Sequence, residues 1–392
     1  MLKKKFKSNN GITLVALVIT IIILLILAGI TISSLTNTGL FGKAQEAKEK
    51  TQNATENQAK TLNEYEDELN KYISGTVEVP KIKKVADNLG TVLSTTDNTE
   101  LQDAYGNKIV VPAGFKLVSN DDTSSAQTVD KGIVIEDATV DSEGKATATA
   151  GSQFVWIPVG KIFTAVAKTE ANTKTIELNR YTFDVSGNPT AQNENIVETY
   201  YQELETSNKG NTVAKSIPNF KESVETNGGY YIGRYEARKN KNGTITEVGT
   251  DTVWNNITQQ NAATQAQNMY NSTKFTSDLM NSYAWDTETL FLQICGTNAT
   301  YSRKNSVNNG SVASKGTNTQ STKDVQCNVY DMASNVYEWT TETSFNSNYP
   351  CIDRGGCYGN NNIFASYRKI DSTSFSDGSI GFRPILFLEP NS

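Results

Sequence analysis

The longest hydrophobic segment of the chain lies near its N-terminus, where an almost uninterrupted apolar run extends from Ile12 to Leu35. As a helix this run would be roughly 35 Å long, enough to cross a bilayer whose hydrocarbon core is about 30 Å thick. Several lysines within residues 1–11 precede the run and should stay on the cytoplasmic side. The pattern predicts a basic leader (1–11) and a transmembrane helix (12–35), with the rest of the chain outside the cell.

Beyond the apolar run, residues 36–73 are polar and favour a second helix. It carries one apolar stripe, spaced by three and four residues, formed by Leu62, Tyr65, Leu69 and Tyr72. The stripe could dock on the globular part of the protein or pair with a partner helix in a short coiled coil. Residues 74–100 combine Gly, Pro, Ser, Thr, Asp and Asn and are predicted to be a linker.

Residues 101–392 show the alternating patterns of a mixed domain. Short β-branched and aromatic runs between turn residues predict strands over residues 107–115, 132–135, 154–159, 180–185 and 228–236. The run 154–159 is apolar at nearly every position, so we expect it to be buried on both faces. Alanines on one side predict a helix over 258–270, and Asp286 can cap a second helix. These elements predict the fold class α+β.

Composition narrows the range of functions. The 392 residues carry a formal net charge of −6 at pH 7, which argues against nucleic-acid binding because that needs a basic surface. The chain has no histidine, so the commonest general base and transition-metal ligand is missing. Its four cysteines form no CxxC pair, which disfavours a zinc knuckle or a thioredoxin-like site. Abundant Asn, Thr and Ser suit an exposed extracellular surface.

The most informative stretch lies near the C-terminus. Residues 335–339 (Asn-Val-Tyr-Glu-Trp) alternate polar and apolar side chains, as a half-buried strand does. Gly355 and Gly356 allow a tight turn or a close approach to another strand. Arg354 and Arg383 carry planar guanidinium groups that suit carboxylates or carbonyls in an irregular core.

The order and spacing of these pieces resemble the formylglycine-generating (sulfatase-modifying) enzyme family, whose signature is a GNVWEW-type strand, then RGG, then GFR. Here Ser334 replaces the first glycine of that strand, Tyr337 its first tryptophan, and Cys357-Tyr358 the Ser-Trp pair that follows RGG. The resemblance implies an irregular, C-type-lectin-like domain over residues 101–392.

A second match to this family lies at residues 228–236, which resemble its GFYIGRYE-type strand. Arg234 and Glu236 fall on one face of that predicted strand. We expect them to form a structural ion pair, and the alternative is a catalytic carboxylate.

The N-terminus resembles that of a type IV prepilin, with a short basic leader, a glycine and an immediate apolar helix. In that family a membrane peptidase cuts after the glycine, here Gly11, and the new first residue, here Ile12, is methylated. Ala16 stands where the family usually has glutamate, which favours a minor subunit or a plain membrane anchor over a major pilin. An uncleaved signal-anchor helix is the alternative.

The resemblance to the enzyme family does not bring its active sites with it. Oxidase members hold copper(I) with two cysteines between RGG and GFR, whereas residues 358–370 contain none. The ergothioneine-synthase-like branch binds iron through histidines, which this chain lacks. We therefore expect neither copper nor iron, and a protein that is not an enzyme. Cys351 and Cys357 could form a local disulfide or stay free, and Cys295 and Cys327 could be buried thiols or a second bridge.

The resemblance also implies a calcium ion at the GNVWEW-type loop. The matching positions are Asp331, Ser334, Val336 and Glu338, of which Ser334 and Val336 would supply backbone oxygens. Two carboxylates together with carbonyls suit a hard cation. In the alternative, Asp331 and Glu338 only hydrogen-bond the turn.

A recognition surface is predicted where the family has its chemistry. Tyrosine offers rigid contact area and asparagine adaptable hydrogen bonds. Both gather in one C-terminal stretch, at Asn346, Tyr349, Tyr358, Asn360, Asn361, Asn362 and Tyr367. This stretch also resembles the diversified C-terminal segments of retroelement-variable proteins that share this fold.

Together these features predict a cell-surface protein in which a pilin-like helix anchors or assembles a catalytically degenerate domain, displayed as a ligand-binding or adhesion module. Expected partners are the membrane, other pilin-like subunits or secretion and assembly machinery, and an extracellular ligand, but not nucleic acid. The expected location is a single-pass cell membrane with a cytoplasmic N-terminus, or a surface pilus after cleavage. Two alternatives are an oxidoreductase of the formylglycine-generating type with an altered cysteine site, and a structural minor pilin subunit.

Overall fold

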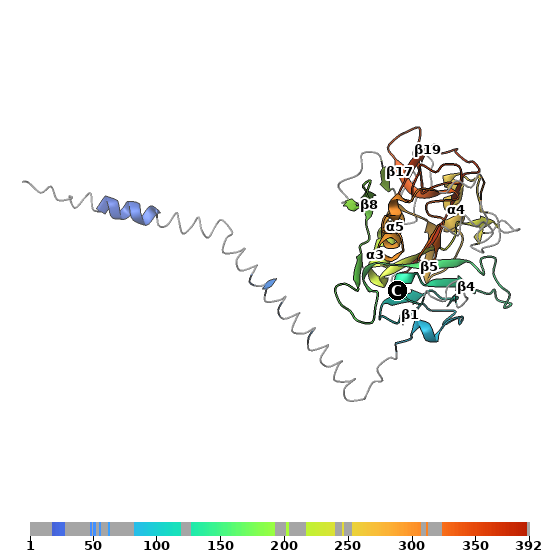
Figure 1. The fold of residues 1–392 in the computed structure, drawn as a ribbon. Helices are drawn as coiled ribbons and strands as arrows, with labels where there is room; N and C mark the ends of the chain where they lie inside the picture. The colour runs from blue at the N-terminus through green and yellow to red at the C-terminus, as the bar shows by residue number, and fades with distance from the viewer. Residues whose placement is uncertain are drawn as a thin grey trace, which may run out of the picture. The chain divides into compact units, whose positions relative to one another are not determined.

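The chain divides into two compact units, Met1–Lys81 and Ile82–Ser392. The second unit is mixed α+β and consists mostly of strands (Figure 1). A computed structural model describes residues 18–27, 48, 50, 51, 55, 62, 82–118, 127–192, 201–203, 217–239, 245–246, 253–306, 311–312 and 324–389.

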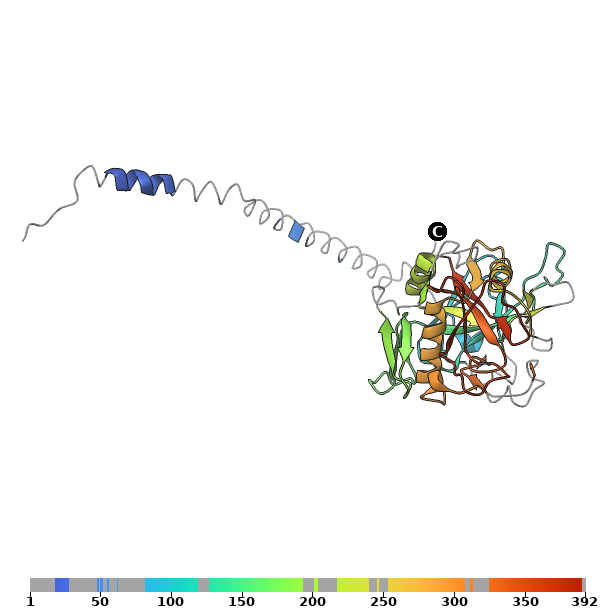
Figure 2. The same ribbon diagram turned by 90° about the horizontal axis from the view of Figure 1, so that it is seen from above.

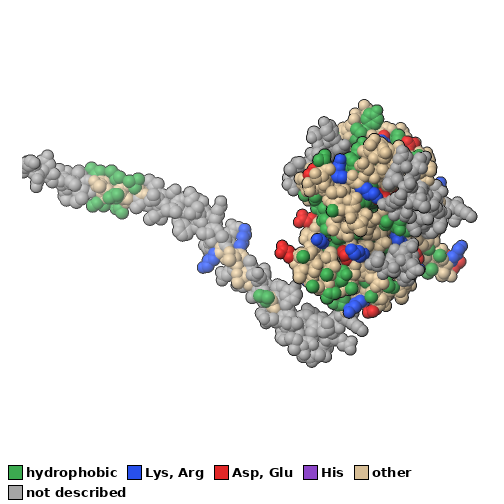
Figure 3. All heavy atoms as spheres, viewed as in Figure 1, with side chains coloured by type: hydrophobic (Ala, Val, Ile, Leu, Met, Phe, Trp, Pro, Cys, Tyr) green, Lys and Arg blue, Asp and Glu red, His purple; other side chains and the backbone are tan. Residues whose placement is uncertain are grey.

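In the first unit, residues 18–27 form a helix whose apolar side chains are exposed. Hydrophobic side chains cover this stretch in Figure 3. Across the ranges that the structure describes, no helix is both long enough and apolar enough to cross a membrane. Gly11, Ile12 and most of the predicted helices 12–35 and 36–73 lie outside those ranges.

The core of the second unit is an antiparallel six-stranded sheet, counted over the described residues. In sheet order its strands are β14 (Phe275–Leu279), β21 (Pro384–Leu388), β11 (Gly229–Gly233), β5 (Gln153–Pro158), β4 (Val134–Asp137) and β3 (Phe115–Leu117). The C-terminal strand β21 pairs between β14 and β11, so the last residues of the sheet are held in its interior.

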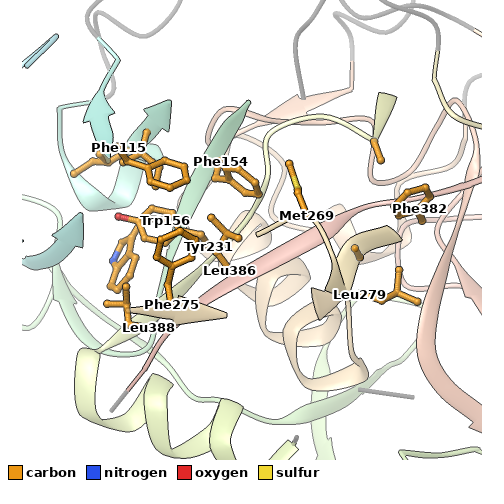
Figure 4. Packing of buried hydrophobic residues seen from close by; sticks show 14 of the residues in the cluster. Phe115, Phe154, Trp156, Tyr231, Met269, Phe275, Leu279, Phe382, Leu386 and Leu388 are labelled. Atoms are coloured by element: carbon orange, nitrogen blue, oxygen red, sulfur yellow. The ribbon is translucent and has the colours of Figure 1, made fainter. Parts of the chain in front are cut away.

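Alternate side chains of this sheet enter two separate cores, because successive strand residues point to opposite faces. On one face Trp156 and Tyr231 join the larger core, part of which is shown in Figure 4. On the other face Val155 and Ile232 pack with residues of two helices. The prediction that residues 154–159 are buried on both faces is confirmed for the strand itself, which ends at Pro158.

A second, five-stranded sheet carries the motif-bearing C-terminal residues. It contains β10 (Tyr201–Glu203), β17 (Tyr337–Ser344), β18 (Cys351–Arg354) and β19 (Arg368–Asp371), with β20 (Ile380–Phe382) parallel to β17. Every residue of β17 is buried, whereas the sequence predicted a half-buried strand over residues 335–339. The difference arises because both faces of β17 are covered; for example, the Trp339 indole donates to the Ile257 carbonyl.

Five two-stranded pairs complete the strands of the described residues. They are β1 (Thr99–Gln102) with β2 (Lys108–Val111), β6 (Gly160–Phe163) with β7 (Thr173–Ile176), β8 (Arg180–Phe183) with β9 (Pro189–Gln192), β12 (Arg238–Lys239) with β13 (Ile245–Thr246), and β15 (Val325–Gln326) with β16 (Val329–Tyr330). Short 3₁₀ turns occur at η1 (Val85–Asp87), η3 (Val129–Lys131) and η4 (Tyr301–Arg303).

Among the described residues of the second unit, the α-helices are α3 (Ile217–Asn227), α4 (Gln259–Gln267) and α5 (Ser282–Cys295). Thr258 caps α4 by accepting the Asn261 N–H, which agrees with the predicted helix over 258–270. Asn281, and not Asp286, caps α5, because its side chain accepts the Ala284 N–H. Asp286 lies inside α5, so its predicted role as a cap is wrong. Figure 2 shows the β8–β9 hairpin beside α5.

Two sequence expectations differ from the structure at element ends. Residues 82–100, which the sequence assigned to the linker 74–100, belong to the second unit, since Val85 is buried in its core. β11 ends at Gly233, before Arg234 and Glu236, so these side chains do not share a strand face. Arg234 donates to Gln153 Oε1, and Glu236 accepts from other groups described below; these contacts replace the ion pair predicted between them.

Candidate functional site

The predicted calcium loop between β16 and β17 is built from buried polar residues. Asp331 (φ 62°) and Asn335 (φ 66°) adopt left-handed backbone conformations, which Asp and Asn tolerate better than most residues. The Ser334 N–H donates to the Asp331 carbonyl, and the Ser334 hydroxyl donates to Asp324 Oδ2 at 2.8 Å. The loop is therefore held by its own polar groups beneath the surface.

Glu338, the second predicted carboxylate ligand, is bound by an arginine. Arg383 donates from Nη2 to Glu338 Oε1 at 2.7 Å and from Nε to Oε2 at 3.1 Å. The same guanidinium donates to the carbonyls of Gly233 and Tyr330. The expectation that Arg383 binds carboxylates or carbonyls is confirmed, and both oxygens of Glu338 are occupied.

Glu236 lies against the same loop and bonds its backbone. It accepts from Asn335 Nδ2 at 2.5 Å and from the Val336 N–H at 3.2 Å. Burial, followed by the nearby Glu338 carboxylate, raises the pKa of Glu236 to about 8. The side chain is therefore protonated in the folded protein over much of the range in which an exposed glutamate is charged.

Five buried carboxyl groups form what we call the acidic cluster: Glu236, Glu288, Asp324, Asp331 and Glu338. Burial, and then the neighbouring Glu236 and Asp324, raises the pKa of Asp331. Burial also raises the pKa of Glu288. Among the described residues, Asp331 Oδ1 and Glu288 Oε1 have no hydrogen-bond partner. Arg383 pairs with Glu338 and Lys304 with Asp324, so protonation or an added cation is needed only for the remaining carboxyl groups of the cluster.

These contacts determine which of the predicted calcium ligands have an oxygen available for a metal ion. Asp331 offers a free oxygen, but Glu338 is neutralised by Arg383. Within the described ranges, no three Asp, Glu or Cys side chains are arranged to hold a metal ion. The four predicted ligands therefore fit calcium only if Glu338 leaves Arg383, and Asp331 is the best placed of them.

A second buried ionic network, which we call the arginine network, consists of two acids and three arginines. Arg354 donates to Asp286 Oδ1 at 2.5 Å and to Glu342 Oε2 at 3.2 Å. Arg368 binds the same two acids, and Arg180 donates to Glu342 at 2.6 Å. Burial alone would raise the pKa of Glu342, but the guanidinium groups of Arg368, Arg354 and Arg180 more than offset it and lower the pKa to about 2. The network ties α5 to the strands β8, β17, β18 and β19.

The predicted ligand surface is divided between the two ends of the β17–β18 hairpin. Asn346 and Tyr349 are exposed in the turn that joins these strands. Tyr358 and Asn360–Asn362 lie in the loop that follows β18, at the opposite end of the hairpin. Tyr367 closes this loop and is half-buried. The structure thus brings Tyr358, Asn360–Asn362 and Tyr367 into one loop and separates them from Asn346 and Tyr349.

The two glycines that start this loop explain how closely it packs against the loop of Asp331–Val336. Gly355 has φ 78°, a left-handed conformation that favours glycine. A Cβ on Gly356 would lie 1.9 Å from the Ala333 carbonyl oxygen, so no other residue fits there. Further along, the Tyr358 N–H donates to the Asn335 carbonyl at 2.7 Å. The expected tight turn and close approach are both confirmed.

None of the four cysteines forms a disulfide, so of the two alternatives left open for each pair the structure has the unbridged thiols. Burial raises the pKa of Cys295 to about 12 and raises that of Cys327 as well, so neither thiol is a ready nucleophile.

The comparisons with known proteins give distant similarities only. No protein-family model matches the sequence, and no curated protein matches it. Among solved structures, the chain is similar to Treponema denticola variable protein 1, with a TM-score of 0.32 and 13% identity over 62% of this chain and 98% of that one. It is also similar to the Major Tropism Determinant M1 variant, with a TM-score of 0.32 and 14% identity over 79% of this chain and 99% of that one. For CarF the TM-score is 0.28 and the identity 15%, over 42% of this chain and 87% of that one.

Proposed function

We propose that this protein displays a ligand-binding or adhesion domain outside the cell. The observation that carries the proposal is the loop after β18. This loop exposes Asn360–Asn362, and hydrogen bonds to buried residues hold its backbone. The Ser306 hydroxyl donates to the Cys357 carbonyl, and the Tyr358 N–H donates to Asn335. A loop that is already ordered loses little entropy on binding, and its amides adapt to varied partners.

The expected ligand is an extracellular partner and not a nucleic acid. On the face shown in Figure 3, basic and acidic side chains are scattered among uncharged polar groups. The net charge of −6 would repel a phosphate backbone. A protein or glycan surface is the class of ligand that this composition suits.

We further propose that the domain has the irregular, C-type-lectin-like fold of the formylglycine-generating enzyme family. Support comes from the way the three motif pieces meet. Glu338 of β17 lies opposite Arg354 of β18 and Gly381 of β20, and Arg383 binds its carboxylate. The loop between the motifs lacks the two cysteines that copper would need, which supports a catalytically degenerate domain.

For the N-terminal segment we propose a pilin-like helix that anchors the chain in a single-pass orientation or assembles it with other subunits. The basic leader, Gly11 and the apolar run support this, and residues 18–27 are helical with exposed apolar side chains. An exposed apolar helix must be covered by lipid or by partner helices. The membrane and pilin-like subunits or assembly machinery are the partners that fit.

Processing after Gly11 is the first testable consequence. Mass spectrometry of the chain from its native cells should find a methylated Ile12 as the first residue, and Gly11→Val should abolish the cut, with Gly39→Val as the control. Protease added to intact cells should degrade the domain. A native chain that still begins at Met1 would contradict processing and leave a plain anchor, and co-purification with fibres would favour the structural pilin subunit.

The loop after β18 can be tested by adhesion. Replacing Asn360, Asn361 and Asn362 together by serine keeps the loop polar but shortens its amides, and should reduce adhesion of cells that carry the protein to mucin and matrix proteins at least tenfold. The matched control is Asn346→Ser with Tyr349→Ser at the other end of the hairpin. Loss of adhesion in the control alone would move the ligand surface to the β17–β18 turn. Equal adhesion by all variants would contradict a role for either end.

Calcium remains a proposal for the loop of Asp331, Ser334, Val336 and Glu338. The free Asp331 oxygen and the surplus of buried carboxyl groups support it, while the Arg383–Glu338 pair opposes it. A bound ion would stabilise the folded state by mass action, so EDTA should lower the thermal midpoint by several degrees, and excess calcium should restore it. Asp331→Asn should remove the response. An unchanged midpoint after chelation would contradict the ion.

A further inference from the structure

The described residues line an open surface cavity of about 610 Å³ that shares no lining residue with the loop after β18. Its walls come from residues 95–96 before β1, Ala113 between β2 and β3, Thr139 and residues 147–149 between β4 and β5, and residues 269–275 between α4 and β14. Small-molecule sites commonly measure about 300–1,000 Å³, so the cavity has the size of a ligand site.

The cavity has a rigid apolar side. Met269, Tyr270 and Phe275 line it. The Tyr270 ring lies 5.3 Å from the Phe275 ring and 5.8 Å from that of Phe115, centroid to centroid. Figure 4 shows Phe115, Phe275 and Met269 within the larger core, and packing in that core restrains these side chains. Such a surface suits the C–H face of a ring-shaped ligand.

The opposite side of the cavity is a chain of hydroxyl groups anchored on a buried carboxylate. Asp137 is only 2% exposed. Its Oδ1 accepts the Thr139 hydroxyl at 2.7 Å, and its Oδ2 accepts the Tyr270 hydroxyl at 2.9 Å. The Thr139 and Thr147 hydroxyls lie 2.7 Å apart, and Thr149 follows at 3.4 Å from Thr147.

The Asp137 carboxylate can only accept hydrogen bonds, so it fixes the direction in which the hydroxyl groups of this row donate their protons. A hydroxyl has a single proton, so Thr139, which donates its proton to Asp137, must accept from Thr147. Thr147, whose proton goes to Thr139, must in turn accept from Thr149, and Tyr270 donates directly to Asp137. The hydroxyl protons therefore point toward Asp137, and the lone pairs of the outer threonines are left for the cavity. The wall is suited to a ligand that donates hydrogen bonds.

The charges around the cavity restrict the ligand further. Among its lining residues Lys274 alone is charged, and its ammonium lies 3.1 Å from the Asp97 carboxylate. This pairing leaves the lining with no uncompensated charge, so neither a cationic nor an anionic ligand would gain an ion pair there. A neutral ligand is therefore favoured.

We propose that this cavity binds a neutral, polyhydroxylated ring, that is, one sugar unit of a glycan or glycoside. Its hydroxyls would donate to Thr147 and Thr149 while its C–H face covers the half-buried Tyr270 ring. The site is separate from the loop after β18, so it stands whether or not that loop binds a partner.

The test is saturation-transfer NMR and titration calorimetry on the full-length chain. The probes are the methyl glycosides of glucose, galactose and N-acetylglucosamine, with cyclohexanol and inorganic phosphate as controls. At least one glycoside should bind with Kd on the order of 1 mM, as expected for a ligand of this size, and both controls should bind more weakly. Equal binding of cyclohexanol, tighter binding of phosphate, or no glycoside binding would overturn the proposal.

Three variants locate the binding. Thr147→Val keeps the shape of the side chain but removes its hydroxyl, and should weaken the glycoside at least fivefold. Ala148→Phe, at an exposed lining position, should fill the cavity and abolish binding. Thr190→Val, on the exposed strand β9, should bind as the unaltered chain does. Glycoside binding that survives both cavity variants would place the sugar elsewhere and overturn the assignment.

Discussion

Arg354→Met is expected to destabilise the second unit by about 3–5 kcal/mol, since it removes one partner from a buried ionic network. Arg354 is fully buried and binds Asp286 and Glu342 at once. Its Nε also donates to the Tyr367 carbonyl at 3.1 Å. Methionine fills much of the same volume but leaves two buried carboxylates with less positive charge. Urea unfolding of the full-length chain, followed by tryptophan fluorescence, measures the loss.

Two further variants separate charge from geometry at this site. Arg354→Lys keeps a positive charge but cannot bridge both acids with a planar fork, so an intermediate loss is expected. Lys108→Met removes an exposed ion pair with Glu100 and should cost less than about 1 kcal/mol. A loss for Arg354→Met as small as that for Lys108→Met would mean that Arg368 and Arg180 satisfy Asp286 and Glu342 without it.

The sequence predicted those strands and helices that are marked by the spacing of apolar residues close together in the chain. The apolar run 154–159 and the alanines of 258–270 appear as β5 and α4, because burial on a strand or a helix follows from the spacing of neighbouring residues. The turn at Gly355 and Gly356 was also foreseen, since glycine is the residue that tolerates both a positive φ and a close carbonyl.

The sites were less predictable because their residues are distant in the chain. Arg354 was expected to bind carboxylates, but Asp286 lies in a helix 68 residues away and was assigned as a cap. Glu338 was assigned to calcium, and its pairing with Arg383 depends on how β17 and β20 align. The threonine wall of the cavity gave no sequence signal, since single threonines between strands occur on any polar surface.

A fall in stability between about pH 5 and pH 8 is expected from the acidic cluster. The folded state raises the pKa of Glu236 to about 8, whereas an unfolded glutamate titrates near 4.5. Between these values the unfolded chain has released a proton that the folded chain keeps, so rising pH favours unfolding. The raised pKa values of Asp331 and Glu288 act in the same direction. The arginine network acts oppositely, because the pKa of Glu342, lowered to about 2, makes stability fall as pH drops below 4.5.

Glu236→Gln separates these contributions, because glutamine has nearly the shape of a protonated glutamate and cannot ionise. The free energy of unfolding, measured by urea titration in EDTA from pH 5 to pH 8, should lose part of its downward slope in this variant. At pH 8 the variant should exceed the unaltered chain by an amount on the order of a few kcal/mol. Glu143→Gln, at an exposed turn, should leave the profile unchanged. A parent profile that is flat or rises over this range would show that Glu236 is charged in the fold, and that the arginines beside it compensate its burial.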